Sequence, residues 1–310
     1  MTHWANLNEI TASTGIRLVF LVYRVFGRLP VLLILYPVIF WFLLFNKTAR
    51  NSSFDYLNRL YLYSNKTSPK PTYLNVFRHL YAFGECILDK LIIWSGHLED
   101  LVYTLDGLNG FKTLIGEKSG AVIVVSHIGN LDFCRAIALQ YPNLKLTVLV
   151  HTAHAVNFNQ LLKSINPESA LNIVQVSSFS MHDAILFSEK INLGELISIA
   201  GDRVPLKGEN TIPVNFLGAQ ANLPVGPYLL ARALGCPLFS LSSIKVDGIY
   251  QLGVQELSKW NSEEKNDPNG IAKSAQAFAN ILSENCLKSP FQWFNFYPFW
   301  QKTNASKIKP

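Results

Sequence analysis

The chain has 310 residues, of which 49% are hydrophobic and only 15% are charged, well below the usual charged share of about a quarter. A surface made only for water carries more charge, so part of this surface is expected to face something else. The formal net charge is +6, and all of this excess lies in residues 1–70, which hold eight Lys or Arg and two Asp or Glu. A basic segment of this kind favours an anionic membrane surface and argues against a nucleic-acid partner, which needs the charge on a folded face.

The N-terminal segment predicts membrane-binding helices. Residues 15–28 are apolar except for Arg17, Arg24 and Arg28, which the spacing places on one stripe of a helix. The segment Leu29–Phe45, which contains Trp41, has no charged residue. Its length is at the short end of what crosses a bilayer, and these three arginines and Trp41 are the expected membrane contacts.

Two prolines, Pro30 and Pro37, interrupt the uncharged segment. It is therefore compatible with one spanning helix or with a helical hairpin in one leaflet, and the alternative is a buried core helix. A cleaved signal peptide is not expected, because Glu9 precedes the apolar run and no small-residue cleavage site follows it. The predicted domains are a membrane-binding helical region over residues 1–50 and a catalytic domain over residues 51–310.

The rest of the chain predicts an α/β domain with a central mixed sheet. Helices are expected at 52–63 and 72–95, and from about residue 100 short β-branched runs alternate with helical patterns. The expected strands are 121–125, 144–150, 172–176, 194–200, 212–218, 237–245 and 249–256. One helix is expected between the first of these strands and residue 139, and further helices are expected at 154–165, 181–191 and 224–234. Loops at the carboxyl ends of such strands carry the functional residues.

The sharpest chemical signal is Val124–Asp132, with the sequence VVSHIGNLD. It places His127 directly after a strand and Asp132 in the helix that follows. Residues five apart on one helix point about 140° apart, so a pair requires His127 to precede the helix and Gly129 to allow the bend. Asp132 would then bond one imidazole nitrogen and leave the other free to accept a proton. A histidine that merely caps a helix is the alternative.

This segment resembles the His-x4-Asp/Glu motif of the glycerolipid and lipid A acyltransferases. GELISIAGDRVP at 194–205, the stretch from 212 to 239 and PFQWFNFYPFW at 290–300 are similar to later blocks of that family, in the same order. The N-terminal segment HWANLNEITASTGIRLVF is similar to a bacterial branch found with synthases of aryl-polyene lipids. The resemblance implies N-terminal membrane-binding helices followed along the chain by a glycerolipid-acyltransferase-like α/β domain.

The resemblance also implies a reaction. An acyl thioester, usually on acyl carrier protein, donates a fatty or polyenoic acyl group to a hydroxyl of a membrane lipid or glycolipid at the cytoplasmic face of the bacterial inner membrane. His127 would deprotonate that hydroxyl without an acyl-enzyme, and backbone amides at the helix start near Gly129–Leu131, that of Asn130 included, would stabilise the oxyanion. The lipid A enzymes usually have Glu at the position of Asp132, which leaves the acceptor open.

Several further residues are candidates for substrate binding. Asp202 and Arg203 end a predicted strand, and Arg203 is suited to a phosphate; a structural Asp–Arg pair at a turn is the alternative. Gly218 and Gly226 belong to a stretch that shapes a loop beside the acyl cleft, or simply makes turns. In the resembled branch a histidine stands at the position of His154.

No metal and no cofactor is expected. His151 and His154 form an H-x2-H pair, but no carboxylate or thiolate lies at a useful spacing. The four cysteines form no CxxC pair, which argues against a zinc or redox site and favours a reducing compartment. The aromatic segment at 290–300 is expected to pack on the core rather than to lie at the membrane.

Two other functions remain open. A lipid hydrolase would use the same His127 with an activated serine or water, but no motif supplies the serine. A catalytically inactive membrane scaffold would keep the fold alone, and the presence of His127, Asp132 and Arg203 argues against it.

Overall fold

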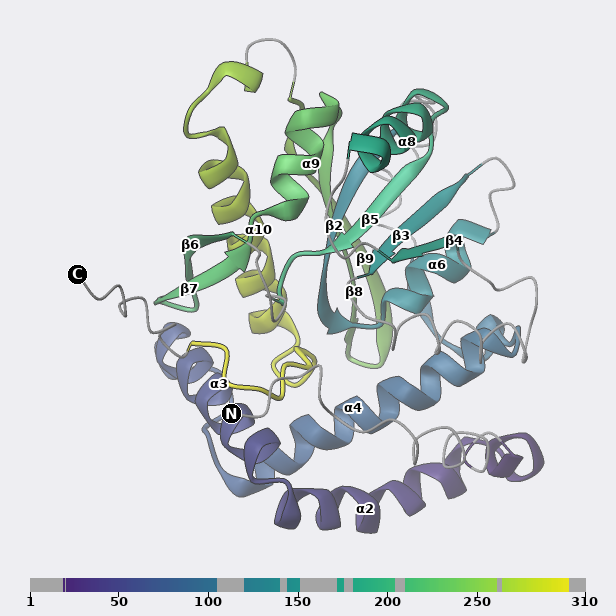
Figure 1. Cartoon of the computed structure of the whole chain (residues 1–310). Helices are drawn as coiled ribbons and strands as arrows, with labels where there is room; N and C mark the ends of the chain where they lie inside the picture. Colours follow the sequence, from purple (N-terminus) through teal and green to yellow (C-terminus); the bar gives the residue numbers. More distant parts are fainter. Residues whose placement is uncertain are drawn as a thin grey trace.

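A computed structural model of the chain describes residues 19, 21–104, 120–139, 144–150, 172–175, 181–203, 210–260 and 264–300. Its centre is a seven-stranded sheet with the order β1-β9-β8-β2-β5-β3-β4 (Figure 1). These strands are β1 (Tyr103–Thr104), β2 (Ala121–Gly129), β3 (Leu146–Val150), β4 (Asn172–Gln175), β5 (Leu196–Ala200), β8 (Leu238–Val246) and β9 (Ile249–Ser258). The strands β6 (Thr211–Phe216) and β7 (Ala219–Pro224) form a separate antiparallel hairpin.

The sheet is mixed, which confirms the predicted class. β2 pairs in parallel with β5 on one side and with β8 on the other, whereas β8 and β9 are antiparallel. Parallel neighbours end at the same edge of a sheet, so the segments that follow β2 and β5 emerge side by side. This edge is where the candidate site forms.

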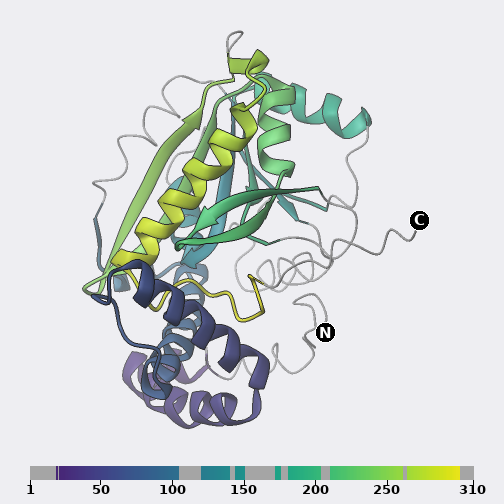
Figure 2. The ribbon, with the colours of Figure 1, turned by 90° about the vertical axis from the view of Figure 1, so that its left-hand side faces the viewer.

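The side chains of β2 alternate between two cores, as a strand buried on both faces requires. Val122 and Val124 pack with helices α8 (Met181–Asn192), α9 (Gly226–Leu234) and α10 (Gly270–Lys288). Ala121, Ile123 and Val125 face the other side, where they pack near the start of α6 (Leu131–Leu139). Figure 2 shows α10 running diagonally across the first of these faces, with α9 beside it.

Three helices form a layer at one end of the molecule, α2 (Arg28–Phe45), α3 (Lys47–Tyr63) and α4 (Tyr73–Trp94) (Figure 1). The predicted boundary between residues 50 and 51 falls inside α3. The carboxylate of Asp89, which is 1% exposed, joins this layer to the sheet. It accepts hydrogen bonds from Arg28 Nη1 at 2.5 Å, Lys245 Nζ at 3.0 Å and Tyr250 OH at 2.7 Å. A buried charge needs such partners, so these bonds fix the position of α4 against β8 and β9.

Helix α2 matches the predicted uncharged segment and continues through Pro37. It is long and apolar enough to cross a membrane, and the molecule buries 17% of it. Only Val31, Ile39 and Leu43 are buried. A core helix would bury most of its apolar side chains, so the core-helix alternative does not fit the described part of the chain.

Most elements expected from the sequence are present within a few residues, but β1 and β7 were not predicted and further differences occur. The expected helix at 154–165 lies outside the described residues. The strand expected at 212–218 belongs to the hairpin and not to the central sheet. Helix α10 was not predicted, although its buried residues recur at helical spacing.

Strand β2 continues four residues beyond its predicted end, so His127 lies within it. The backbone of Gly129 has φ +62°, and a Cβ there would lie 1.8 Å from the carbonyl oxygen of Ser243. Both the left-handed conformation and the close approach to β8 exclude a side chain.

We therefore expect Gly129→Ala to destabilise the fold severely, because the added methyl group collides with backbone. Gly96→Ala is the matched control, since Gly96 also has positive φ (+86°) but nothing within 4 Å of its Cβ position. It should cost only about 1–2 kcal/mol for the left-handed conformation. Thermal unfolding of both variants measures the difference, and equal melting temperatures would contradict the packing at Gly129.

Candidate active site

His127 and Asp202 form the centre of the site. His127 lies near the end of β2, and Asp202 follows the end of β5, the parallel neighbour of β2. The imidazole Nδ1 and Asp202 Oδ1 are 2.7 Å apart. The backbone N–H of His127 donates to Asp202 Oδ2, also at 2.7 Å. The carboxylate thus holds both the ring and the main chain of His127.

Burial and neighbouring charges set the protonation of this pair. Burial lowers the pKa of His127. The positive charge of Arg203 lowers this pKa further, and the opposing effect of Asp202 is smaller. Burial alone raises the pKa of Asp202, but the contacts with His127, together with Arg203, outweigh burial and hold that pKa below its usual value. A neutral imidazole next to an ionised carboxylate donates its Nδ1–H, so the lone pair lies on Nε2. This is the state that a general base requires.

The predicted pairing of His127 with Asp132 is wrong in this structure. Asp132 lies in the first turn of α6, where its Oδ1 accepts a hydrogen bond from Trp94 Nε1 at 3.0 Å. Its Oδ2 is 3.3 Å from Lys90 Nζ. No hydrogen bond or ion pair between Asp132 and His127 occurs among the described residues. Because β2 continues through His127, the start of α6 points Asp132 toward α4 and not back toward the ring.

The aromatic segment that follows α10 is hydrogen-bonded to both members of the His127–Asp202 pair. Trp293 Nε1 donates to Asp202 Oδ2 at 3.1 Å, and the backbone N–H of Phe294 donates to the carbonyl oxygen of His127 at 2.9 Å. Arg203 Nη2 donates to the Phe294 carbonyl oxygen at 3.1 Å. Trp293 is fully buried and Phe294 is 6% exposed, which confirms that this segment packs on the core.

A cavity of about 520 Å³ opens at His127. Its walls come from the junction of α2 and α3, from α4, from the end of β2 and from the aromatic segment. The described lining residues are Phe42, Asn46, Thr48, Ala49, Phe83, Cys86, Lys90, Ser126, His127, Gly129, Leu131, Arg203, Phe294, Phe296 and Tyr297. A cavity with aromatic walls and a few polar groups is typical of a ligand site.

Most of the backbone amides expected to stabilise an oxyanion are already bonded. The N–H of Gly129 donates to Gln292 O at 2.9 Å, and that of Asn130 to Ser243 O at 2.8 Å. Asn130 is fully buried, and its Oδ1 accepts the N–H of Asp132 at 3.2 Å. Asn130 therefore caps α6 and does not line the cavity. Leu131, at the first position of α6, does line it.

The other predicted substrate-binding residues are not brought together. Gly218, with φ +74°, forms the turn between β6 and β7, and Gly226 begins α9; neither lines the described cavity. Gly218 is explained by its turn, whereas a Cβ at Gly226 would meet nothing within 4 Å. His154 lies outside the described residues. Arg203 lines the cavity, and its contact with a substrate stays a prediction.

The predicted membrane contacts have different environments. Arg24 is exposed, and Trp41 is 64% exposed on α2. Arg28 is ion-paired with the buried Asp89 at 2.5 Å and its side chain is 29% exposed, so its membrane contact stays a prediction. Arg17 lies outside the described residues.

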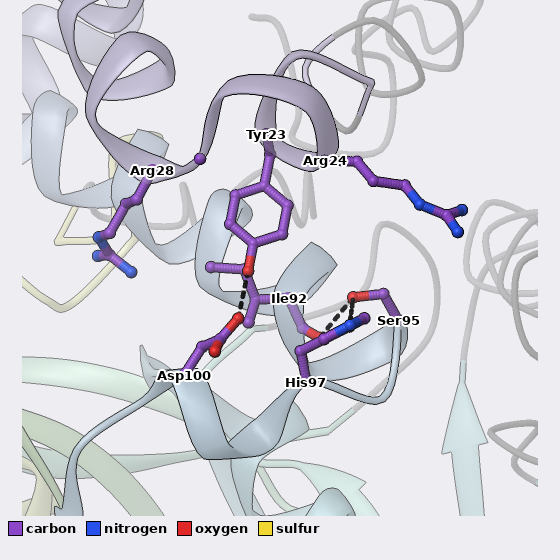
Figure 3. A pocket seen from close by; sticks show the side chains of 8 residues that line it. Tyr23, Arg24, Arg28, Ile92, Ser95, His97 and Asp100 are labelled. Carbon is purple, nitrogen blue, oxygen red and sulfur yellow. Dashed lines mark hydrogen bonds between the residues drawn. The ribbon is translucent and has the colours of Figure 1, made fainter.

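A second cavity, of about 630 Å³, lies beside the start of α2 (Figure 3). Tyr23 OH donates to Asp100 Oδ2 at 2.6 Å across it, and Ser95 Oγ is 3.0 Å from His97 Nδ1. Arg24 extends away from these pairs. The polar side chains of this second cavity are therefore mostly bonded to one another, and none of its described residues forms a His–carboxylate pair. We place the chemistry at His127.

Two other kinds of site lack support in the described residues. No group of three or more His, Cys, Asp or Glu side chains there could hold a metal ion. Ser126 lines the cavity beside His127, but no hydrogen bond in the described chain joins its hydroxyl to the imidazole. A serine nucleophile would need that bond.

The fold and site define a class of protein in which a partly exposed histidine, held by a buried carboxylate, faces an aromatic-walled cavity. Residues 83–302, more than two thirds of the chain, match the model of the bacterial lipid A biosynthesis acyltransferase family. The chain belongs to this family, whose members are acyltransferases of lipid biosynthesis. No curated protein matches the chain.

Trp293→Phe tests the support beneath Asp202, because it removes one hydrogen bond to a buried carboxylate and keeps an aromatic ring. A bond of this kind contributes about 1.5–3 kcal/mol. We expect the free energy of unfolding to fall by this amount. We also expect acyl transfer to drop by at least about tenfold, since the lost hydrogen bond changes the interaction of Asp202 with the base by a similar free energy. Both are measured by denaturant unfolding and by a transfer assay.

Trp260→Phe is the control, because Trp260 is 1% exposed and its Nε1 has no hydrogen-bond partner among the described residues. This variant should lose packing but keep its transfer rate. Equal transfer by the two variants would contradict the support role of Trp293.

Proposed function

We propose that the chain transfers a fatty or polyenoic acyl group from an acyl thioester, carried by acyl carrier protein, to a hydroxyl of a membrane lipid or glycolipid. The observation that carries the proposal is the contact at 2.7 Å between His127 Nδ1 and the buried carboxylate of Asp202. This contact leaves Nε2 as the basic nitrogen of a residue that lines a 520 Å³ cavity. The resemblance to the aryl-polyene branch is the reason for including polyenoic chains.

The reaction follows from this geometry. His127 Nε2 takes the proton of the acceptor hydroxyl as its oxygen attacks the thioester carbonyl carbon. The resulting oxyanion receives a hydrogen bond from the N–H of Leu131, since the first amides of a helix have no acceptor within it. Collapse of the intermediate breaks the C–S bond, and the imidazolium returns the proton to the departing thiolate. Asp202 stays ionised throughout and stabilises the imidazolium.

Attachment to the cytoplasmic face of the inner membrane is part of the proposal. Its support is the exposed apolar surface of α2, which includes Leu29, Leu33, Trp41 and Phe45 at 64–75% exposure. An exposed apolar patch of this size typically marks a membrane or protein contact. Phe42 of the same helix lines the active-site cavity, so a lipid acceptor reaches the site from that side.

His127→Ala should abolish transfer and leave the fold intact, because the ring is partly exposed at the cavity. Asp202→Asn should lower turnover by about 10²- to 10⁴-fold, the range for loss of general-base function. In the wild type the acid limb of the kcat/KM profile should lie below pH 6.5, because the pKa of His127 is lowered and the base stays neutral until the pH falls through that value. Wild-type transfer by His127→Ala, or an acid limb above pH 6.5, would refute the proposed base.

Membrane attachment is tested by flotation with anionic phospholipid vesicles. The double variant Trp41→Glu, Phe45→Glu places two charges on the exposed face of α2 and should shift the protein to the soluble fraction. Leu193→Glu is the control, since Leu193 is 78% exposed in the loop that follows α8. If the double variant floats as well as Leu193→Glu, or if the wild type does not float, α2 is not the membrane contact.

A further inference from the structure

The charged residues around the active-site cavity are all of one sign. Among the described lining residues, Lys90 and Arg203 are cations, His127 is the base, and no carboxylate is present. The remaining walls are largely aromatic or aliphatic, formed by Phe42, Phe83, Leu131, Phe294 and Phe296. A cavity with apolar walls and two cations is complementary to an amphiphile that has an apolar chain and an anionic group.

Lys90 reaches this cavity because of its position on α4. Phe83, Cys86 and Lys90 are spaced three and four residues apart, which puts them on one face of the helix. All three line the cavity. The neighbouring Asp89 fixes the rotation of α4 through its bonds to Lys245 and Tyr250. Lys90 therefore faces the cavity as a consequence of how α4 is held.

Asp132 lies behind Lys90 and keeps it charged. Lys90 Nζ is 3.3 Å from Asp132 Oδ2, and Trp94 Nε1 holds the other carboxylate oxygen at 3.0 Å. The Lys90 side chain is 30% exposed, whereas that of Asp132 is 16% exposed. Burial lowers the pKa of Lys90, but Asp132 outweighs burial and raises it. The cation thus faces the cavity and the carboxylate faces the protein.

A purely structural ion pair between α4 and α6 would explain the contact between Lys90 and Asp132, but not why Lys90 lines the cavity. Such a pair has no reason to present its cation to a cavity that already contains Arg203. Asp89 and Lys245 form a pair of this purely structural kind, at 3.0 Å with the lysine side chain 25% exposed. Lys245 does not line the cavity in the described chain.

We propose that Lys90 is a second anion-binding residue of the active-site cavity, held in place by Asp132, and that with Arg203 it takes the phosphate group of an acyl-chain substrate. Asp132 is then a positioning residue for Lys90 rather than for His127. The assignment of that phosphate to a substrate rests on the proposed acyl transfer, and the donor arm and the acceptor lipid are its two sources. Binding of the phosphate itself does not depend on the reaction.

The direct test is binding of octyl phosphate, with octanol as the neutral comparison, to the full-length protein in dodecyl maltoside. The wild type should bind octyl phosphate more tightly than octanol. Lys90→Met should reduce that preference by about 10- to 100-fold, as expected for one charge-assisted hydrogen bond, and Lys90→Arg should retain most of it. The control Lys190→Met should keep the full preference, because it breaks the Lys190–Glu195 pair at 2.8 Å, which contacts neither α4 nor the described lining of the cavity. An unchanged preference in Lys90→Met, or an equal loss in Lys190→Met, would overturn the proposal.

Asp132→Asn separates positioning from catalysis. If Asp132 acts through Lys90, Asp132→Asn weakens octyl phosphate binding in the wild type but adds nothing in the Lys90→Met background. Equal losses in both backgrounds would overturn the positioning role. His127→Ala should bind octyl phosphate like the wild type, because phosphate binding does not need the base. A wild-type protein that binds octyl phosphate with this preference but shows no acyl transfer would refute the proposed reaction and leave the anion site standing.

Steady-state kinetics identifies the source of the phosphate. Lys90→Met should raise the KM for the acyl carrier protein donor if the cation holds the phosphopantetheine arm. It should raise the KM for a phosphate-bearing acceptor if the cation holds the acceptor. Unchanged KM values for both, with reduced kcat alone, would contradict a binding role for Lys90.

Discussion

The buried carboxylate of Asp202 is the constraint around which the site is built. A charge that is 1% exposed is unfavourable unless hydrogen bonds surround it. Here the partners are the ring and main chain of His127 and the indole of Trp293. Each comes from a different part of the chain, so the carboxylate links β2, β5 and the segment after α10 into one unit. Removing any of them leaves a buried charge with too few partners.

A second set of contacts joins the site to the N-terminal helices α3 and α4. The fully buried His79 of α4 has its Nε2 2.9 Å from the carbonyl oxygen of Trp293 and its Nδ1 2.8 Å from Ser53 Oγ of α3. Burial lowers the pKa of His79 to about 4, so it is neutral at physiological pH. Helices α3 and α4 are thereby bonded to the same tryptophan that supports Asp202.

Charge is layered across the site. Asp202 and Asp132 lie toward the protein, whereas Arg203 and Lys90 line the cavity. The two cations oppose protonation of His127, while Asp202 holds its ring in one tautomer. An electrostatic field of this form favours an anionic substrate and a neutral base at the same time.

Much of the fold could be predicted from the sequence, because β-branched runs, helical periodicity and the uncharged segment are local signals. His127 and Arg203 were also found, since each lies near the end of a buried strand. The partner of His127 was missed because it depends on which strands are neighbours. Nothing local shows that β5 lies beside β2, and the spacing of His127 and Asp132 suggested a nearer partner. Lys90 was not singled out for the same reason, since its position at the cavity depends on how α4 packs.

The central claim is that His127 is a neutral base held by Asp202. The most direct measurement is the ¹⁵N chemical shifts of the His127 imidazole in the full-length protein, followed as a function of pH. The account predicts a neutral ring at pH 7, with the proton on Nδ1 and the lone pair on Nε2, that becomes protonated only below pH 6.5. Asp202→Asn should change the Nδ1 signal, whereas Asp132→Asn should leave the tautomer unchanged. A ring that is charged at pH 7, or that carries its proton on Nε2, would contradict the account.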